Sequence, residues 1–475
     1  MTSPAMASAA ATSPAATPRR VLVVGGGLAG ITAAIALREA GLGVTLLEAR
    51  PRLGGAASSG ARGSMMIDTG QHVFLRCCQA YRELLATLGV TGSVTIQDRF
   101  DVTVLSADGT ARLRRNALPS PLHMAGSLAG YRLLSLPERL RVGRAAIALA
   151  RADPGRPELD RARLGDWLSS RGQDERARRR LWDLFIVSAL NIAGDDASVP
   201  LAATVIKTAL LGAKDAADIG MATVPLSQLH GTAASALLSR LGAKVRLRTK
   251  VAAIKPQPGG GLAAVLSDGR SEPADCVVLA VPASHAARLG ASAGITAAAK
   301  WDRLGYSPIV NVHVVYGQRV TRLPFAAAVD SPVQWVFDKT RQAGVESGQY
   351  LAVSLSAADR YVDAPAAALR QEFLPALERL FPAAAQTTVT DFFVTRERHA
   401  TFRQVPGNAG LRPGAATSVP GLVLAGAWTD TGWPDTMEGA VRSGHNAVSE
   451  VMRQLAWLPS ASQATAQVTA GLGAP

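Results

Sequence analysis

Hydrophobic residues near the start of the chain first run together and then recur at helical spacing. Residues 21–24 are four consecutive apolar residues, as in a buried strand, and residues 28–40 follow with the pattern of a buried helix. A glycine-bounded turn at residues 41–43 leads into a second apolar run at residues 44–47. Two such strands around one helix predict a parallel pair joined by a right-handed crossover.

The rest of the chain divides into a helical part and parts rich in strands. Residues 81–89 and most of residues 111–225 predict helices, and the latter contain a buried face at helical spacing, formed by Leu181, Leu184, Phe185 and Ser188. Short apolar runs predict strands at residues 245–247, 251–254, 262–266, 276–280 and 422–424, with a last helix beginning near residue 436. Alternating positions predict an antiparallel sheet from residues 309–316, 333–337 and 350–355.

These patterns predict an α/β fold in which a Rossmann-like nucleotide-binding domain is interleaved with a substrate domain of antiparallel sheet and helices. The nucleotide-binding domain is expected in three pieces, residues 20–110, 226–290 and 391–455. The substrate domain is expected from residues 111–225 and 291–390. An Ala/Ser/Thr/Pro tract at residues 1–19 predicts a disordered leader, and residues 456–475 predict a flexible tail.

Gly25, Gly27 and Gly30 satisfy the G-x-G-x-x-G pattern in its required context, after a strand and at the start of a helix. The first glycine permits a tight turn, the second lets the backbone approach a pyrophosphate, and the third lets helix and strand pack closely. Leu28 and Ala29 open the helix, whose free N–H groups and dipole attract phosphate. The turn therefore predicts a dinucleotide site.

Glu48 ends the second strand, eighteen residues beyond Gly30. A carboxylate there accepts hydrogen bonds from ribose hydroxyls and repels a 2′-phosphate, which disfavours NADP. The turn alone leaves open a transient nicotinamide cofactor, a permanently bound flavin, or no ligand. A second glycine run at residues 259–261 joins two short predicted strands and is expected to be a hairpin turn, so the sequence predicts one dinucleotide site.

Three further stretches resemble the amine oxidase and phytoene desaturase superfamily of FAD proteins. Residues 49–56 place arginines before a second glycine pair, residues 68–72 read Asp-Thr-Gly-Gln-His, and residues 424–444 form a glycine-rich C-terminal motif. The resemblance implies an FAD-binding domain of the amine oxidase type that holds FAD non-covalently, with the backbone of Val251 beside the adenine. The FAD contacts expected in all are Gly25, Gly27, Leu28, Ala29, Gly30, Glu48, Ala49, Arg50, Arg52, Gly54, Gly55, Ala56, Gly70, His72, Val251, Gly426, Asp430 and Met437.

The C-terminal motif carries two more expectations and one departure. The resemblance places the backbone near Met437 where a helix start stabilises negative charge on a reduced flavin. Asp435 and Glu438 predict a capping box at that helix start. The family pattern has aspartate where this chain has Ala427, so either Asp430 or backbone groups replace that carboxylate or FAD is held less tightly.

Five stretches are more closely similar to the hydroxysqualene dehydroxylases, squalene-associated FAD enzymes of bacterial hopanoid pathways: residues 181–191, 224–231, 306–316, 333–340 and 397–415. The similarity spans about residues 20–455 and implies reductive removal of an allylic hydroxyl from hydroxysqualene, a hydrophobic C30 isoprenoid, to give squalene. Hydroxide is a poor leaving group, so an acid is expected to protonate it. His72 and Asp338 are the candidate donors, and each also fits a structural hydrogen-bonding role.

Other functions remain open. A carotenoid or phytoene desaturase would use the same fold in the oxidative direction. An amine oxidase would need a flavin-site lysine, for which Lys300 is a candidate whose flanking residues lack the family pattern. A prenyl-binding escort protein of the same fold lacks flavin, which the glycine turn and Glu48 oppose. With one dinucleotide site, the external reductant is expected to be NAD(P)H that visits transiently, or a ferredoxin-like carrier.

Charge adds an expectation about partners. The chain has a net charge of +14, and residues 112–180 hold sixteen arginines, no lysine and seven acidic residues. Together with apolar stretches at residues 122–134 and 145–150, this excess predicts that residues 112–180 bind anionic lipid at the cytoplasmic membrane, with a solvated arginine-rich face as the alternative. No reader motif accompanies the arginines, so nucleic acid is not expected as a partner.

The three cysteines are Cys77, Cys78 and Cys276. Their number and spacing fit neither a set of disulfide bonds nor a zinc site, so no metal site is expected. A reducing, cytoplasmic location is expected instead. No run of eighteen apolar residues predicts a spanning helix, which favours peripheral association with the membrane.

Overall fold

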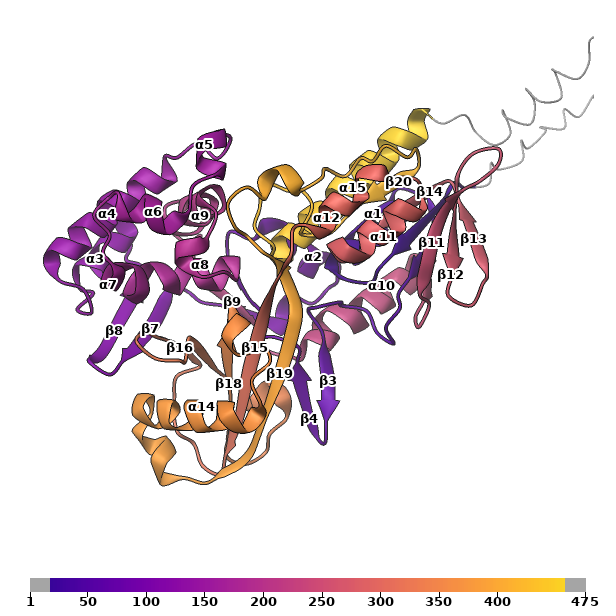
Figure 1. The fold of residues 1–475 in the computed structure, drawn as a ribbon. Coiled ribbons are helices and arrows are strands. Elements are labelled where there is room, and N and C mark those ends of the chain that lie inside the picture. The colour runs from indigo at the N-terminus through magenta and orange to yellow at the C-terminus, as the bar shows by residue number, and fades with distance from the viewer. Residues whose placement is uncertain (1–17, 458–475) are drawn as a thin grey trace, which may run out of the picture.

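The computed structural model of the chain describes residues 18–457 (Figure 1). Of the predicted leader and tail, residues 1–17 and 458–475 lie outside the described residues. Figure 1 shows a helical part at one end of the molecule, drawn in purple, and the nucleotide-binding part at the other end. Long strands of an antiparallel sheet lie between and below these two parts.

A five-stranded parallel sheet forms the nucleotide-binding part, in the order β10-β2-β1-β14-β20. The strands are β1 (Arg20–Val24), β2 (Gly43–Leu47), β10 (Lys244–Arg246), β14 (Cys276–Leu279) and β20 (Leu422–Leu424). Helices α1 (Leu28–Glu39) and α15 (Met437–Trp457) pack together, so closely that a side chain at Gly444 would meet the Ala29 carbonyl oxygen at 2.7 Å. The first predicted crossover is confirmed.

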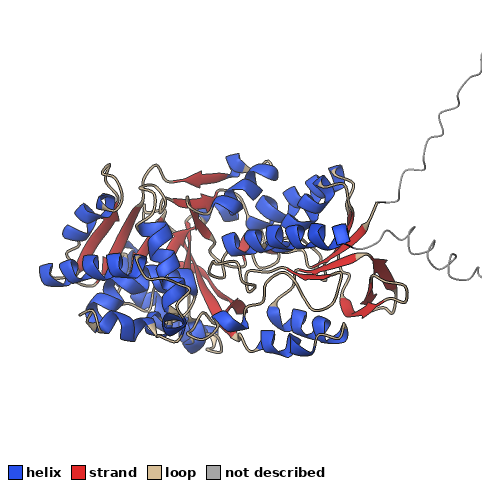
Figure 2. Ribbon diagram, turned by 90° about the horizontal axis from the view of Figure 1, so that it is seen from above, coloured by secondary structure: helices blue, strands red, loops and turns tan. Residues whose placement is uncertain are grey.

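Further helices and a small antiparallel sheet complete this part, as Figure 2 shows from above. The helices are α2 (Gln79–Thr87), α10 (Ala233–Arg240), α11 (Ala283–Ser292) and α12 (Ala299–Asp302), and the sheet contains β11 (Val251–Pro256), β12 (Leu262–Leu266) and β13 (Ser271–Ala274). The hairpin turn predicted at residues 259–261 is confirmed, with φ angles of +87°, +103° and +78° that only glycine adopts readily.

A seven-stranded, mostly antiparallel sheet has the order β19-β15-β18-β17-β16-β7-β8. Its strands are β7 (Asp101–Ser106), β8 (Gly109–Arg114), β15 (Tyr306–Tyr316), β16 (Phe325–Ala328), β17 (Trp335–Asp338), β18 (Gln349–Leu355) and β19 (Val389–Phe402). Helix α14 (Ala366–Leu380) packs on one face, where alternate residues of β15 contribute Val310, Val312 and Val314 to a shared core. The antiparallel sheet predicted from three strands is therefore confirmed and enlarged.

The seven-stranded sheet contains residues from both predicted domains. Residues 101–106 and 391–402 were assigned to the nucleotide-binding domain by the sequence, but they lie in β7 and β19 of the seven-stranded sheet. The sequence does not predict β19, because most of its residues are half-buried and polar residues interrupt the alternation of apolar and polar positions that is typical of a strand. Its hydrogen bonds run to β15, more than seventy residues earlier in the chain, and no local pattern reports such a pairing.

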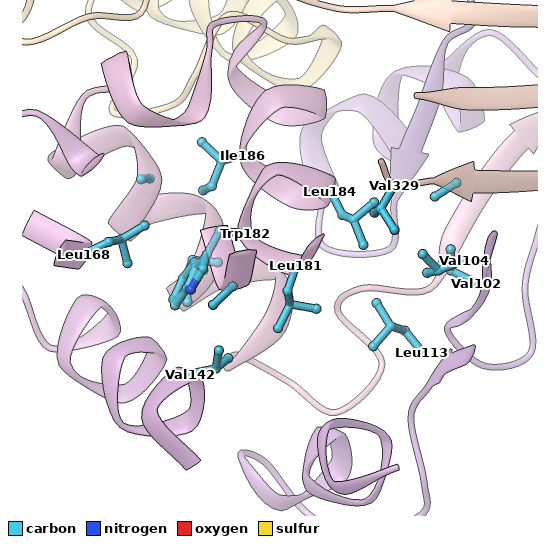
Figure 3. Close-up of a cluster of buried hydrophobic side chains, with 14 of the residues drawn as sticks. Val102, Val104, Leu113, Val142, Leu168, Leu181, Trp182, Leu184, Ile186 and Val329 are labelled. Atoms are coloured by element: carbon cyan, nitrogen blue, oxygen red, sulfur yellow. The ribbon is translucent and has the colours of Figure 1, made fainter. Parts of the chain in front are cut away.

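The helical part contains α3 (Ala125–Ala129), α4 (Leu136–Ala150), α5 (Pro157–Asp160), α6 (Leu164–Ser169), α7 (Glu175–Ala177), α8 (Asp183–Leu190) and α9 (Val199–Val205). Figure 3 shows its core, in which Val142 of α4 lies near Leu181 and Trp182. Leu181 and Leu184 of the predicted face are buried in that core, whereas Ser188 accepts a hydrogen bond from the indole of Trp335 at 2.7 Å. No helix within residues 18–457 has both the length and the hydropathy to cross a membrane.

Two small sheets join these parts. The hairpin of β3 (Ser59–Arg62) and β4 (Met65–Asp68) leads into the turn that contains His72. The strands β5 (Val73–Leu75), β6 (Val94–Ile96) and β9 (Ile219–Ala222) form a three-stranded sheet. Because β8 ends at residue 114 and β9 lies at 219–222, the segment predicted as mostly helical contains strands at both of its ends.

Candidate active site

The first glycine turn has the close contacts that its sequence predicts. Gly25 has φ +109°, and a side chain there would lie 2.2 Å from the Ala280 carbonyl oxygen. A side chain at Gly30 would lie 1.9 Å from the Gly25 oxygen. Gly27 is the N-cap of α1 and makes no side-chain cap, and no acidic residue lies in the first turn of the helix. The amino end of α1 therefore offers backbone N–H groups to an anion, which fits a dinucleotide pyrophosphate.

Glu48 holds this turn in place. Its carboxylate oxygens accept hydrogen bonds from the Gly26 N–H and the Arg50 N–H, each at 2.6 Å, and the residue is only 8% exposed. The Glu48 carbonyl also accepts the Thr249 N–H at 2.8 Å, which sets the start of β11 and with it Val251 beside the same strand end. The sequence predicted a ribose contact for Glu48 and missed this structural role, which needs the folded positions of both loops.

The second glycine pair lies against the first turn. The Gly54 N–H donates to the Gly26 oxygen at 2.8 Å, and a side chain at Gly55 would lie 2.9 Å from the Gly27 Cα atom. Gly54 and Gly55 both have positive φ, +110° and +59°. The neighbouring predicted contacts are all exposed and so are free to meet a ligand: Ala49, Arg50, Arg52 and Ala56.

A buried ion pair lies where the Asp-Thr-Gly-Gln-His stretch begins. Asp68 at the end of β4 is 4% exposed, and its carboxylate accepts hydrogen bonds from Ser59 Oγ at 2.7 Å and Gln342 Nε2 at 2.9 Å. The ammonium group of Lys339, directly after β17, lies 3.3 Å from the same carboxylate. Burial lowers the pKa of Lys339, and the charge of Asp68 opposes that effect.

Lys339 was missed by the sequence, which considered Lys300 as the only flavin-site lysine. Lys300 is exposed on α12 and cannot play that role from its position. Lys339 lies in one of the stretches similar to the hydroxysqualene dehydroxylases. A lysine that follows an aspartate is, however, typical of an exposed turn, so the sequence does not mark it as a site residue. Only the burial of its ammonium group beside Asp68 distinguishes it, and burial at a strand end is a tertiary property.

His72 and Asp338 differ in the availability of their polar atoms. His72 Nδ1 lies 3.0 Å from the Gly70 oxygen, so that nitrogen carries the proton and donates it. Burial lowers the pKa of His72, which makes the ring neutral at pH 7. Asp338 accepts hydrogen bonds from Thr340 N at 3.0 Å and from Gln349 Nε2 at 2.7 Å. Asp338 thus has a structural role at the end of β17, and His72 retains a free ring nitrogen.

Buried amide groups without partners face this region. Neither side-chain polar atom of Asn311 or of Gln71 has a hydrogen-bond partner among residues 18–457, and Asn311 is 0% exposed. Asn311 lies on β15 opposite Thr395, and the next pair along that face is Ile309 and Glu397. The charge of Glu397 acts on His72, which places the His72 turn near the same stretch of sheet. A native protein rarely leaves such groups unpaired unless a ligand or water satisfies them.

His313, on the same face of β15, is by contrast fully satisfied. Its ring nitrogens lie 2.7 Å from Tyr350 Oη and 2.9 Å from Thr395 Oγ1, and its ring stacks on Phe393 at 4.4 Å. Burial lowers its pKa to about 3, so the ring is neutral and structural. Asn311, two residues earlier on the same face, has no such partners within residues 18–457, and neither do the hydroxyl groups of Ser307 and Tyr316 at the two ends of this strand.

The C-terminal motif is held by an arginine that the sequence did not single out. The guanidinium of Arg412 donates to the carbonyl oxygens of Thr429 at 2.6 Å and Trp433 at 2.9 Å, and burial lowers its pKa. Gly426, with φ +139°, donates its N–H to Ser443 Oγ at 2.8 Å. Asp430 is exposed and accepts the Gly432 N–H at 3.3 Å. Ala427 is buried, and its own carbonyl oxygen accepts a hydrogen bond from the Arg412 guanidinium at 3.2 Å.

The predicted capping box at α15 is wrong. Glu438 is 1% exposed and points away from its own helix start, accepting the N–H groups of Ala80 at 3.3 Å and Tyr81 at 2.8 Å, and so it caps α2. Asp435 accepts the Phe402 N–H at 2.8 Å, and burial raises its pKa to about 6. Thr436 caps α15 instead, through a 3.2 Å hydrogen bond from Gly439 N–H. The start of this helix, at Met437, is thereby fixed against both β19 and α2.

Comparison with known proteins gives consistent matches. The family described as flavin containing amine oxidoreductase matches residues 28–452. A hydroxysqualene dehydroxylase of Rhodopseudomonas palustris is 30% identical over 443 residues, covering 91% of this chain and 98% of that protein. A zeta-carotene desaturase of Synechocystis sp. is 25% identical and covers 93% of this chain and 99% of that protein.

The fold is also that of solved structures. The cyclohexylamine oxidase from Brevibacterium oxydans superposes with a TM-score of 0.69 at 20% identity, covering 93% of this chain and all of that one. The α/β fold predicted from the sequence, a dinucleotide-binding sheet interleaved with an antiparallel sheet and helices, is confirmed by this match and by the sheet order.

Proposed function

Because the chain belongs to the family of flavin containing amine oxidoreductases and is a flavin-dependent oxidoreductase, we propose that it converts hydroxysqualene to squalene. The observation that carries the proposal is the 30% identity to a hydroxysqualene dehydroxylase over nearly the whole length of both chains. That match includes the helical part and the seven-stranded sheet, which are the segments available to bind a substrate, as well as the parallel sheet.

The proposed cofactor is FAD, held non-covalently by the two glycine turns and by the amino end of α1. When bound and reduced, FAD supplies the two electrons of the reaction as a hydride. NAD(P)H or a ferredoxin-like carrier is proposed as the external reductant. In the balanced reaction a C–H bond replaces the C–O bond and the hydroxyl leaves as water, which requires one proton from the protein.

Lys339 is proposed as the source of that proton. Its ammonium group is buried beside Asp68, and the lowered pKa makes it a stronger acid than an ordinary lysine. His72 is neutral at pH 7, so its free ring nitrogen accepts a proton rather than supplying one. Asp338, whose carboxylate is engaged by neighbouring donors, holds the strand end that carries Lys339.

Asn311 and Gln71 are proposed to bind the substrate hydroxyl. Each has an amide that can donate to and accept from a hydroxyl group, and each is buried without a partner. A site with unpaired polar groups favours a substrate that carries a hydroxyl over the hydrocarbon product, since only the former satisfies them. This difference would also help the product to leave.

The direct test is anaerobic incubation of the purified protein with FAD, hydroxysqualene and a chemical reductant. Squalene is the expected product, identified by chromatography and mass spectrometry, and its formation should require the reductant. Failure to form squalene from hydroxysqualene under reducing conditions, with the flavin bound and reducible, would overturn the proposal.

A polyene desaturase is the second candidate, favoured by the zeta-carotene desaturase that matches 93% of this chain. It would run in the opposite redox direction, so that the substrate gives up two electrons to the flavin. Incubation with phytoene or ζ-carotene and a quinone acceptor tests it. Desaturated product there, without squalene in the first assay, would establish this candidate instead.

A further inference from the structure

Most of the exposed large hydrophobic side chains come from one stretch of the chain, in the helical part and the loop before it. Eight such residues are exposed in the described part of the chain, and five of them lie between residues 118 and 147. They are Leu118 (50%), Leu122 (54%), Leu136 (61%), Leu140 (59%) and Ile147 (41%). Single exposed leucines are common on protein surfaces, whereas a group of exposed hydrophobic side chains suggests a site that binds another molecule or a membrane.

Helix α4 is apolar on two opposite faces. Val142, Ala145 and Leu149 are buried in the core of the helical part. At 3.6 residues per turn, Leu136, Leu140 and Ile147 fall within about 40° of one another on the other side. We call these three residues the α4 face; Leu118 and Leu122, which precede α3, are exposed in the same part of the chain. An ordinary surface helix has one apolar stripe, so the second stripe is not explained by packing within the chain.

Three exposed arginines on or next to α4 have no side-chain partner within residues 18–457, and Arg161 farther along the basic segment has none either. Arg115, Arg163, Arg178 and Arg180 each bind an aspartate. Arg132, Arg144 and Arg151 are exposed and form neither an ion pair nor a side-chain hydrogen bond within residues 18–457. The acidic residue of α4, Glu138, is buried in the helix cap with Ser135. Arg144 lies on α4 and Arg151 at its C-terminal end, so part of the uncompensated positive charge of the segment lies on the helix that exposes Leu136, Leu140 and Ile147.

We propose that the α4 face binds an anionic lipid surface. Leucine and isoleucine side chains insert among acyl chains while neighbouring arginines meet lipid phosphates, the pattern of a helix that lies in a membrane interface. Figure 1 shows α4 at the end of the molecule away from α1 and α15, so docking there leaves the dinucleotide end free for a reductant. This inference does not depend on the identity of the reaction.

The core behind α4 also connects this face with the sheet. It includes Leu184 and Val329, which line a cavity of about 170 Å³ together with Trp335 of β17. Strand β17 ends at Asp338, directly before Lys339.

Sedimentation with vesicles tests the inference on the full-length protein with flavin bound. Vesicles of phosphatidylcholine alone are compared with vesicles that contain phosphatidylglycerol as well. Binding is expected only to the anionic vesicles and should weaken as salt is added. The R132Q/R144Q/R151Q variant should bind on the order of 100-fold more weakly, since each basic residue near the surface contributes about fivefold.

A second variant, L136S/L140S/I147S, should bind at least about tenfold more weakly by loss of apolar insertion. The matched control is L247S/M452S, which removes exposed hydrophobic side chains that lie outside the α4 face. Equal binding by the arginine variant, the leucine variant and the control would overturn the inference. So would a wild-type dimer, seen by light scattering, that the leucine variant converts to a monomer, because the face would then contact a second copy. Unchanged flavin absorbance and thermal midpoint show that each variant folds.

Discussion

Glu48 shows at the level of one residue how a ligand contact and a structural role coincide. Its carboxylate orders both the Gly26 and the Arg50 backbone through 2.6 Å hydrogen bonds. We predict that E48A lowers FAD affinity on the order of 100-fold, because two backbone donors of the cofactor turn lose a charged acceptor. Titration of the deflavinated protein with FAD measures this. E39A, at the exposed end of α1, is the control and should bind FAD normally.

Asn311 allows function and stability to be separated. Its buried amide makes no hydrogen bond within residues 18–457, so N311L should raise the free energy of unfolding by about 1–3 kcal/mol while it lowers kcat/KM for hydroxysqualene. The control is N191L: the Asn191 amide donates to Ser307 O and Thr401 Oγ1 at 3.0 Å each, so its loss should destabilise the fold. Urea unfolding and turnover are measured for both. A destabilised N311L would assign Asn311 to the core instead.

His230 sets a pH dependence at the second glycine loop. Its Nδ1 donates to the Ala57 oxygen at 2.9 Å and its Nε2 accepts the Tyr81 hydroxyl at 2.8 Å, an arrangement that needs a neutral ring. Burial lowers its pKa to about 4 from 6.5. Because the folded pKa lies below the unfolded one, His230 costs stability as the pH falls from 6.5 to 4, on the order of 3 kcal/mol in total.

The effect of His230 on the pH dependence of stability must be separated from the effects of groups that change stability in the opposite direction. Burial raises the pKa of Asp183 and of Asp435 to about 6, so both gain protons on folding and stabilise the fold as the pH falls through 6. H230Q keeps polar contacts but removes the titration. Urea unfolding measures the free energy of unfolding of wild type and of H230Q. The wild-type value minus the H230Q value should decrease as the pH is lowered from 6.5 to 4. A constant difference across this range would contradict the assignment.

At the level of elements, Glu438 connects two helices that the sequence treats as unrelated. It lies in the first turn of α15 but caps α2, and it also accepts the Arg442 guanidinium at 2.7 Å. E438A should lower the free energy of unfolding by about 2–4 kcal/mol, since buried backbone donors lose a charged acceptor. T436A, which removes only the cap of α15, should cost about 1 kcal/mol. Equal losses of the free energy of unfolding in E438A and T436A would contradict the role of Glu438 as the buried cap of α2.

Local patterns predicted those elements whose reasons are local. Predicted strand 21–24 and helix 28–40 correspond closely to β1 and α1, because apolar runs, glycines and a strand–turn–helix context all lie within one stretch of chain. The capping box failed for the opposite reason. Asp435 and Glu438 have the right spacing, but each finds a better donor on a distant element. The spacing of residues shows which side chains could cap a helix, but it does not show which hydrogen-bond donors on other elements compete for those side chains in the folded protein.

At the level of the whole molecule, the glycine turns were predictable and the site around Lys339 was not. The ion pair of Lys339 with Asp68 joins strand ends 271 positions apart, and the unpaired amide of Asn311 is recognised only once its burial is known. Asp68 ends a strand of the two-stranded β3-β4 sheet, whereas Asn311 and the strand before Lys339 belong to the seven-stranded sheet, which takes strands from three separated stretches that include β7 and β19. Sequence motifs therefore predict the cofactor-binding residues. The residues proposed to bind substrate are brought together by contacts between distant parts of the chain, which composition and motif spacing do not predict.

The two glycine turns come from adjacent stretches and close on each other, so cofactor binding should stabilise the whole fold. FAD that binds only the folded chain should raise the free energy of unfolding by about 4 kcal/mol at a thousandfold excess over Kd. We predict that this rise is lost in G55A, because the new methyl group would lie 2.9 Å from the Gly27 Cα atom and push the turns apart.

Gly63 provides the matched control for this prediction. Its φ of +57° is nearly that of Gly55, +59°, but nothing lies within 4 Å of a side chain placed there. Both alanine variants therefore carry a similar backbone strain of about 1 kcal/mol, and only G55A disturbs the contact between the turns. Thermal unfolding of deflavinated protein across an FAD series should show a rising midpoint for wild type and G63A and a flat one for G55A. A rising midpoint in G55A would mean that the cofactor does not use the contact between these turns.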